Sequence, residues 1–175
     1  MRNMTRRPQL VAILVAMALS LSGRQVLAET VLSLSGPLIE QRVWTGAELA
    51  QMPQTEITVS HAVSSGQVHE AGKTSYRGVL LRELLEAARL REVARHDFRR
   101  MVVAARASDG YVALFTWGEL FNTKLGDQVL VITSVDGKPL ADAEGPYALR
   151  SLGDQRPGPR HVKWLKQIDV IRIGP

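Results

Sequence analysis

The sequence predicts an α+β fold with a mostly antiparallel or mixed sheet in a single domain. Its 175 residues are 45% hydrophobic and 22% charged, which is typical of one globular domain rather than of a disordered chain. One segment has the apolar spacing of an amphipathic helix, and about seven others have the shorter period of strands. The chain holds no cysteine, which excludes disulfides, iron–sulfur clusters and thiolate-bound metals.

The N-terminal segment predicts export from the cytoplasm. A basic stretch, Met1–Arg7, precedes an apolar run, Leu10–Leu21, that is shorter than the about 20 residues needed to span a bilayer. Ala28 supplies the small residue before a cleavage point, so we expect residues 1–28 to be a cleaved signal peptide and residues 29–175 the mature domain. An uncleaved membrane anchor is the alternative, and the Arg6-Arg7 pair partly matches a twin-arginine export signal.

The charge balance argues against a nucleic-acid partner. The net charge is +5, but four of the 22 basic residues and none of the 17 acidic residues lie within residues 1–28. The mature domain is therefore nearly neutral, because the excess of positive charge belongs to the export segment rather than to a binding surface.

The first half of the mature chain combines short strands with helices. Alternation of apolar and polar residues predicts a half-buried strand at its start. Thr45 can cap a short helix that Pro53 stops. The predicted elements are a strand over Val31–Leu34, a helix over Ala47–Met52, a strand over Glu56–Val59, a polar loop over Ser64–Ser75 and an amphipathic helix over Leu80–Leu90.

The second half has the period of strands. Ser108-Asp109-Gly110 is a turn signal between two apolar segments and predicts a hairpin, and Asp136-Gly137 predicts another turn. The predicted strands are Met101–Ala105, Tyr111–Phe115, Val129–Thr133, Tyr147–Leu152 and Ile168–Ile173, with a Pro- and Gly-rich loop over Gly153–Arg160.

The common catalytic motifs are absent from the sequence, but three loops hold groups suited to a flat, nitrogen-rich heterocycle. These loops are His61–Ser75, Ser108–Tyr111 and Asp154–Trp164. A carboxylate can accept paired hydrogen bonds from an amidine-like edge, an aromatic ring can stack, and Arg or Lys can hold an anionic or carbonyl oxygen. Taken singly, the same residues can instead cap turns, fill the core or, for the histidines, lie on the surface without a metal.

Five segments, in order along the chain, resemble the oxidoreductase molybdopterin-binding domain, the sulfite-oxidase fold. They are Tyr76–Leu85, the Asp109-Gly110-Tyr111 turn, Asp136–Leu140, Gly145-Pro146 and Gly158–Leu165 with its Val-Lys-Trp-Leu sequence. The resemblance spans about residues 30–173 and implies a sulfite-oxidase-like mixed-sheet fold.

The departures from this family bear on function. Its catalytic members hold molybdenum through a cysteine near the second strand, where this chain has Val59–Ala62. The chain is similar to small exported members that bind a pterin and control a membrane-bound cyclic-di-GMP enzyme. The resemblance therefore implies a periplasmic, non-catalytic protein that binds a metal-free pterin and relays its occupancy to the periplasmic domain of a membrane-bound signalling protein. The alternatives are a molybdopterin-dependent oxidoreductase or its accessory subunit, and an interaction module with a vestigial pocket.

The resemblance also implies a set of ligand-binding residues. The closing segment contacts the pterin and its tail in cofactor-binding members, the turn lies near the same pocket, and His61 lies close to the missing metal ligand. Arg150 can replace the arginine that the family places at Ala148, because residues two apart on a strand share a face. Asp154 is chosen for its chemistry, as an acceptor for the pterin's amino edge. The expected ligand-binding residues are His61, Asp109, Tyr111, Arg150, Asp154, Arg160, His161 and Lys163.

Overall fold

The computed structural model describes residues 31–36, 40–65, 68–89, 97–156 and 158–174, without the side chains of residues 61–71. The predicted signal peptide, residues 1–28, lies outside the described residues. Among the helices that are described, none has both the length and the apolar character needed to cross a membrane.

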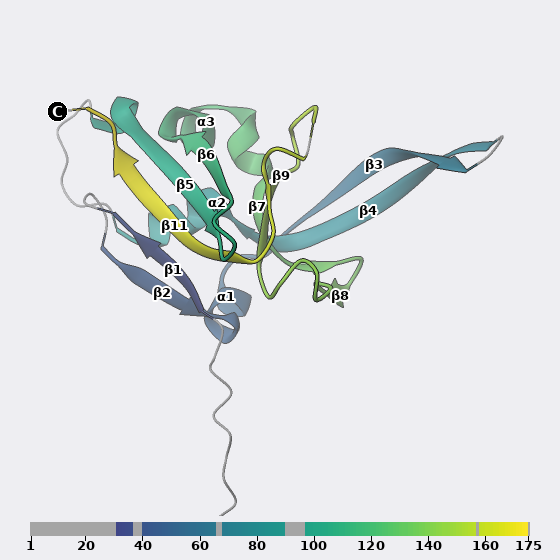
Figure 1. The fold of residues 1–175 in the computed structure, drawn as a ribbon, viewed down its shortest axis with the longest axis horizontal. Helices are drawn as coiled ribbons and strands as arrows, with labels where there is room; N and C mark the ends of the chain where they lie inside the picture. Colours follow the sequence, from purple (N-terminus) through teal and green to yellow (C-terminus); the bar gives the residue numbers. More distant parts are fainter. Residues whose placement is uncertain (1–30, 37–39, 66–67, 90–96, 157, 175) are drawn as a thin grey trace, which may run out of the picture.

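Two sheets make up the body of the protein (Figure 1). In the first sheet, of order β2-β1-β11-β5-β6, the β1–β11 pair is parallel and the other pairs are antiparallel, which confirms the predicted mixed sheet. Its strands are β1 (Val31–Ser35), β2 (Arg42–Thr45), β5 (Met101–Ala107), β6 (Val112–Thr116) and β11 (Leu165–Arg172). The second sheet has the order β10-β9-β7-β4-β3, with β8 paired to β7. Its strands are β3 (Thr55–Ser65), β4 (Val68–Leu80), β7 (Val129–Val135), β8 (Lys138–Pro139), β9 (Ala148–Ser151) and β10 (His161–Val162).

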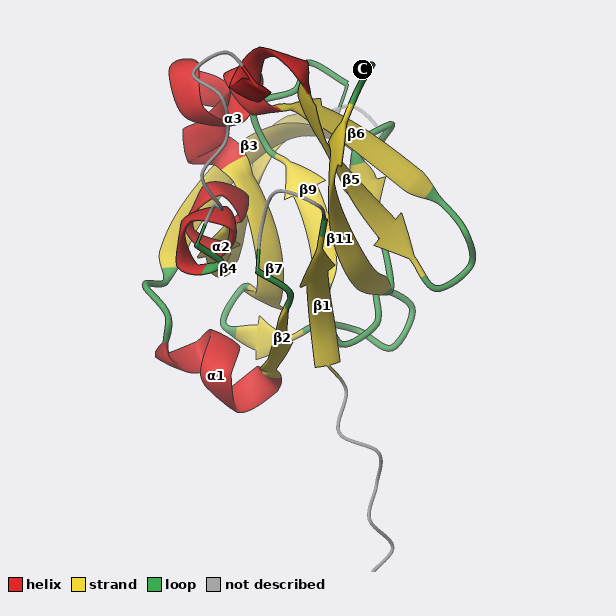
Figure 2. Cartoon of the chain, turned by 90° about the vertical axis from the view of Figure 1, so that its left-hand side faces the viewer, coloured by secondary structure: helices red, strands yellow, loops and turns green. Residues whose placement is uncertain are grey.

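The main core lies between the sheets, with helices along one side (Figure 2). The first sheet contributes fully buried side chains such as Leu34 and Phe115, and the second contributes Val131 and Leu149. Each such side chain stabilises the fold by roughly 1.5–3 kcal/mol relative to exposure. All five strands predicted after residue 100 overlap observed strands, and each supplies buried apolar residues to this core.

The helices are short. The helix predicted over Ala47–Met52 is confirmed as α1 (Gly46–Gln51), capped by Thr45. The helix predicted over Leu80–Leu90 is shorter than expected: α2 spans Leu81–Ala87, and Arg89 has a left-handed φ of 49°, which ends the helix. A third helix, α3 (Trp117–Asn122), was not predicted, although Thr116 and Glu119 form the capping box that begins it. Two 3-10 helices, η1 (Asp97–Arg100) and η2 (Lys124–Gln128), complete the described helices.

The loop predicted over Ser64–Ser75 is wrong, because this segment is part of a long hairpin. β3 and β4 pair without interruption from Thr55–Gly78 to Ser65–Val68. The outer part of the hairpin projects from the body (Figure 1). A projecting ribbon buries neither face in the core, so it lacks the apolar alternation by which a strand is predicted.

Candidate functional site

One row of residues crosses the second sheet on the face opposite the core. Leu80 of β4 pairs with Leu130 of β7, Leu130 pairs with Arg150 of β9, and Arg150 pairs with His161 of β10. The adjacent row, Val79, Val131, Leu149 and Val162, is fully buried in the main core. Because successive side chains of a strand face opposite sides, the burial of this second row directs Arg150 and His161 to the outer face.

Gly78 lets β4 approach β7 closely beside this row. A Cβ atom at position 78 would lie 1.9 Å from the Val131 carbonyl oxygen, so only glycine fits there. A small second apolar cluster, Leu80, Leu130 and Ile132, then covers the outer face, with Tyr76 and Leu140 packed against it. This cluster forms the floor of the candidate site.

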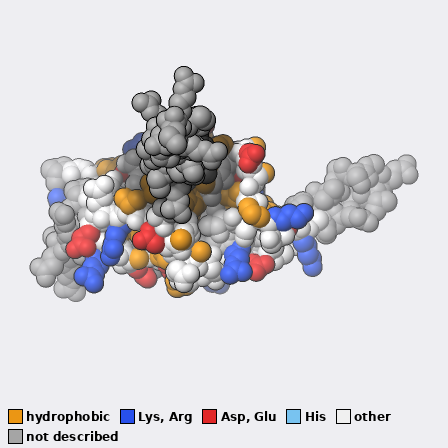
Figure 3. All heavy atoms as spheres, turned by 90° about the horizontal axis from the view of Figure 1, so that it is seen from below, with side chains coloured by type: hydrophobic (Ala, Val, Ile, Leu, Met, Phe, Trp, Pro, Cys, Tyr) orange, Lys and Arg blue, Asp and Glu red, His pale blue; other side chains and the backbone are white. Residues whose placement is uncertain are grey.

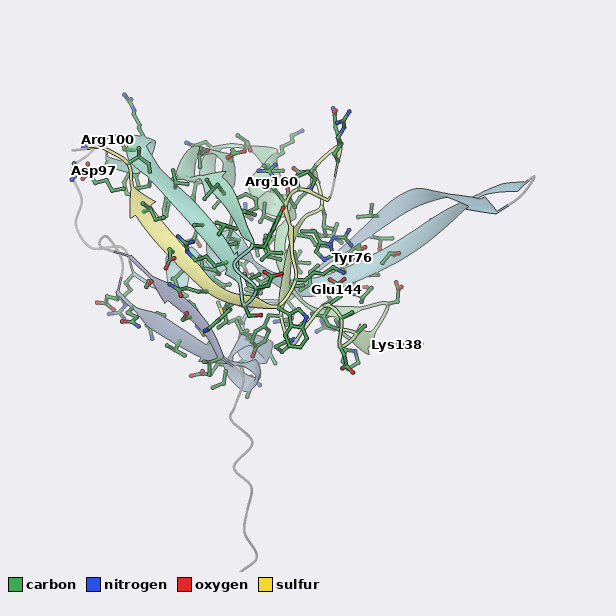
Figure 4. The ribbon with its side chains drawn as sticks, viewed as in Figure 1. Tyr76, Asp97, Arg100, Lys138, Glu144 and Arg160 are labelled. Atoms are coloured by element: carbon green, nitrogen blue, oxygen red, sulfur yellow. The ribbon has the colours of Figure 1, made fainter. Side chains whose placement is uncertain are left out.

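Arg150 and Tyr76 line two cavities. The larger has a volume of about 490 Å³ and is lined by Val59, Ser60, Thr74, Tyr76, Arg150, Leu152, Asp154 and Gln155. The smaller, of about 200 Å³, is lined by Tyr76, Ile132, Val135, Leu140, Ala141, Glu144 and Arg150. Tyr76 and Glu144 lie together at the base of the β3–β4 hairpin (Figure 4). The volume of the larger cavity is within the range of small-molecule sites.

Arg150 lines both cavities, and one of its donors has no partner among the described residues. Its Nη1 donates to the Tyr76 hydroxyl oxygen at 2.6 Å, and its guanidinium carbon lies 5.0 Å from the centre of the Tyr76 ring. Its Nε is buried and has no hydrogen-bond partner among the described residues. A buried donor without a partner costs roughly 1–3 kcal/mol, a cost that an acceptor on a bound ligand would remove.

Glu144 contacts two of the predicted ligand-binding residues, His161 and Lys163. Its Oε2 lies 2.5 Å from His161 Nε2 and its Oε1 lies 2.8 Å from Lys163 Nζ. Burial raises the pKa of the Glu144 carboxyl, but the hydrogen bonds from Lys163 and His161 outweigh it, so that this pKa is lowered. Burial, together with the charge of Arg150, lowers the pKa of His161 despite Glu144. In this contact the His161 Nε2–H donates and the Glu144 carboxylate accepts.

Asp154 and Arg160 bind each other. The Arg160 Nε donates to Asp154 Oδ2 at 2.7 Å, and Arg160 Nη2 donates to the other carboxylate oxygen, which also accepts from Ser151. Arg160 also contacts Glu119 at 3.2 Å and lies over the Phe115 ring. Asp154 lines the larger cavity, and both of its carboxylate oxygens accept hydrogen bonds from Arg160.

The predicted turn lies apart from the cavities at Arg150. Asp109 accepts from the Tyr111 backbone N–H at 2.9 Å, and the Tyr111 hydroxyl donates to the Pro159 carbonyl at 2.7 Å. Neither residue lines these two cavities, so Tyr111 can act on the site only through the loop that contains Pro159. A separate cavity of about 630 Å³ lies nearer this turn, lined by Ser108, Leu140, Gly145 and Trp164 among others.

The structure places His61 in β3, opposite Gly72, and its side chain lies outside the described residues. The preceding residues, Val59 and Ser60, line the larger cavity. Sequence reasoning missed Tyr76 and Glu144 as site residues. Tyr76 heads one of the family-like segments and Glu144 precedes Gly145-Pro146, so the motifs marked both positions without showing their contacts.

The donor set suits an organic ring better than a protein-ligated metal. The described residues contain no group of three or more His, Asp or Glu side chains that could hold a metal ion, and the sequence has no cysteine. The Arg150 donor, the Tyr76 ring and the apolar floor fit a flat heterocycle with carbonyl or ring-nitrogen acceptors. On the face shown in Figure 3, basic and acidic side chains are interspersed rather than gathered into one basic patch.

Comparison with known proteins is consistent with this arrangement. The sulfane dehydrogenase SoxCD from Paracoccus pantotrophus has a similar fold, with a TM-score of 0.60 and 19% sequence identity. The match covers 81% of this chain but 38% of the SoxCD chain. No curated protein sequence matches the chain. Residues 24–173 match the family described as the oxidoreductase molybdopterin binding domain, and the chain belongs to that family.

Proposed function

We propose that the protein is an exported, non-catalytic pterin-binding protein of the periplasm. The observation that carries this proposal is Arg150, which lines two cavities beside the Tyr76 ring and whose buried Nε has no hydrogen-bond partner among the described residues. The carbonyl oxygen and ring nitrogens of a pterin are acceptors that this guanidinium can pair with. The Tyr76 ring and the apolar cluster beneath it offer a surface for the flat ring system.

The donor chemistry supports a metal-free ligand. Soft thiolate ligands are suited to holding molybdenum–dithiolene centres, and this chain has none. Val59 and Ser60 stand at the cavity wall near the position of the family's cysteine. A neutral serine hydroxyl is a weak, hard ligand and does not replace a thiolate.

Pterin occupancy is relayed, in this proposal, to the periplasmic domain of a membrane-bound cyclic-di-GMP signalling protein. The similarity to small exported pterin-binding regulators supports this step. A ligand controls such a partner only if the bound and free forms of the protein have different affinities for it. The free donor of Arg150 provides a physical origin for that difference, since a ligand would pair a group that is otherwise buried alone.

A molybdopterin-dependent oxidoreductase, or an accessory subunit of one, is the second candidate. Family membership and the fold shared with the sulfane dehydrogenase SoxCD favour it. This chain spans well under half of the SoxCD chain, so an enzyme of that kind would need parts from elsewhere.

Protein purified from its native compartment distinguishes the two functions. We expect a released pterin, identified by fluorescence and mass spectrometry after denaturation, without stoichiometric molybdenum. Arg150→Lys keeps the charge but loses the planar fork of donors, so we expect it to weaken pterin binding at least about tenfold. Arg77→Lys, on the neighbouring exposed position of β4, is the matched control and should bind normally. Stoichiometric molybdenum would favour the oxidoreductase, and binding unchanged in Arg150→Lys would refute the assigned site.

A further inference from the structure

Glu144 places a negative charge inside the candidate site. Its carboxylate accepts from His161 at 2.5 Å and from Lys163 at 2.8 Å, and it lines the smaller cavity beside Arg150 and Tyr76. The Lys163 side chain is 50% exposed, whereas those of Glu144 and His161 are 25% and 15% exposed. The acid therefore lies deeper in the site than the lysine that it binds.

The backbone holds Glu144 in this position. Trp164 N–H donates to the Glu144 carbonyl at 2.7 Å, and Leu165 N–H donates to the Tyr147 carbonyl at 2.8 Å. Gly145, with a φ of +83°, lets the Trp164 ring pack directly on the turn, since a Cβ there would lie 2.7 Å from the ring. Backbone hydrogen bonds between residues 144–147 and residues 164–165 thus hold the Glu144 carboxylate between His161 and Lys163.

The basic residues of the site are already neutralised by internal acids. Glu144 pairs with Lys163, and Asp154 and Glu119 pair with Arg160. Of the basic side chains discussed at this site, Arg150 has no described carboxylate partner. A phosphate group would have to displace Glu144 from Lys163 and His161 or lie beside it, and like charges in a partly buried site repel strongly.

We propose that Glu144 is a specificity-determining residue that excludes phosphate-bearing ligands, so that the site selects pterins with an uncharged tail. The inference rests on the proposed function, because it specifies the ligand class of the same site. It assigns Lys163 and His161 to an internal anion rather than to the ligand's tail. Arg150 remains the residue that pairs with the ring.

The test compares 6-hydroxymethylpterin with its phosphate monoester by titration calorimetry. We expect the full chain to prefer the unphosphorylated pterin by at least about tenfold, equivalent to about 1.4 kcal/mol. Glu144→Gln keeps the size of the side chain but frees Lys163, so this preference should disappear or invert. Asp142→Asn removes a charge from the same exposed turn, and in this control the preference should persist. Equal binding of both ligands to the unchanged protein, or an unchanged preference in Glu144→Gln, would overturn the inference.

A second readout works without any pterin. Inorganic phosphate is titrated while the His161 ring is followed by NMR, with the signal assigned by a His161→Gln variant. Phosphate should shift the ring signals in Glu144→Gln and leave them unchanged in the unsubstituted protein. Equal shifts in both proteins, or none in Glu144→Gln, would contradict the role of Glu144. If neither pterin binds, the proposed function fails, and this titration still decides whether Glu144 blocks an anion site.

Discussion

Replacing Arg160 with alanine is expected to lower the free energy of unfolding by about 2–3 kcal/mol. Breaking a fully buried ion pair costs about 3–5 kcal/mol, whereas an exposed pair contributes about 0–1 kcal/mol. The Arg160 and Asp154 side chains are 23% and 11% exposed, so their pair lies between these limits and closer to the buried one. The substitution leaves Asp154 with Ser151 and removes the contact with Glu119.

The assay is urea unfolding of Arg160→Ala, Asp154→Asn and the double variant. The double-mutant cycle should give a coupling free energy of about 2 kcal/mol, because the two side chains share two charge-assisted hydrogen bonds. Arg156→Ala, an exposed position on the same loop, is the control and should change stability by less than about 0.5 kcal/mol. A coupling below about 0.5 kcal/mol would refute the view that this pair belongs to the fold.

Three further predictions concern stability. Gly78→Ala should lower the free energy of unfolding, measured with urea, by about 3 kcal/mol or more, because its Cβ would meet the Val131 carbonyl. Gly118→Ala places its Cβ in open space and should cause no such loss. Thr116→Ala removes the N-cap of α3 and should lower the free energy of unfolding by about 1 kcal/mol, whereas Thr116→Ser keeps a capping hydroxyl and should retain most of that stability. Burial raises the pKa of Asp169, but hydrogen bonds from Ser35, Gln167 and Arg106 lower it below its ordinary value of 3.8. The contribution of the Asp169 carboxylate to the free energy of unfolding is therefore fully present above pH 3.8 and is lost as the pH falls below it. The unfolding temperature of Asp169→Asn should therefore fall less on acidification than that of the unsubstituted protein.

The sequence predicted those parts of the fold that bury one face. Strands β5 and β7 are apolar runs bounded by turn signals, a pattern visible in the sequence, and β6 alternates between exposed and buried residues. The hairpin β3–β4 was predicted only near its base, where the strand expected over Glu56–Val59 lies within β3. The outer part of the hairpin projects from the body. The early end of α2 depends on the left-handed φ of Arg89, which nothing in its helical spacing indicates.

The site was predicted in part for the same reason. Arg150 was expected from strand alternation, since it shares a face with Ala148, whereas His161 was expected from the resemblance to the family's closing segment. The partners of charged side chains depend on contacts between distant segments. Family motifs marked Arg160 and Lys163 but could not show that Asp154 and Glu144 bind them.

The two faces of β9 limit which insertions and deletions the sequence can tolerate there. Arg150 and Leu149 are adjacent on the strand, one in the site and the other in the core. Deleting or inserting one residue there would exchange them, placing a guanidinium in the core and a leucine beside Tyr76. A shift of two residues would keep the faces but move Arg150 by about 7 Å, out of reach of the Tyr76 hydroxyl. New ligand preferences can therefore arise on this face by substitution, while changes in strand length damage site and core together.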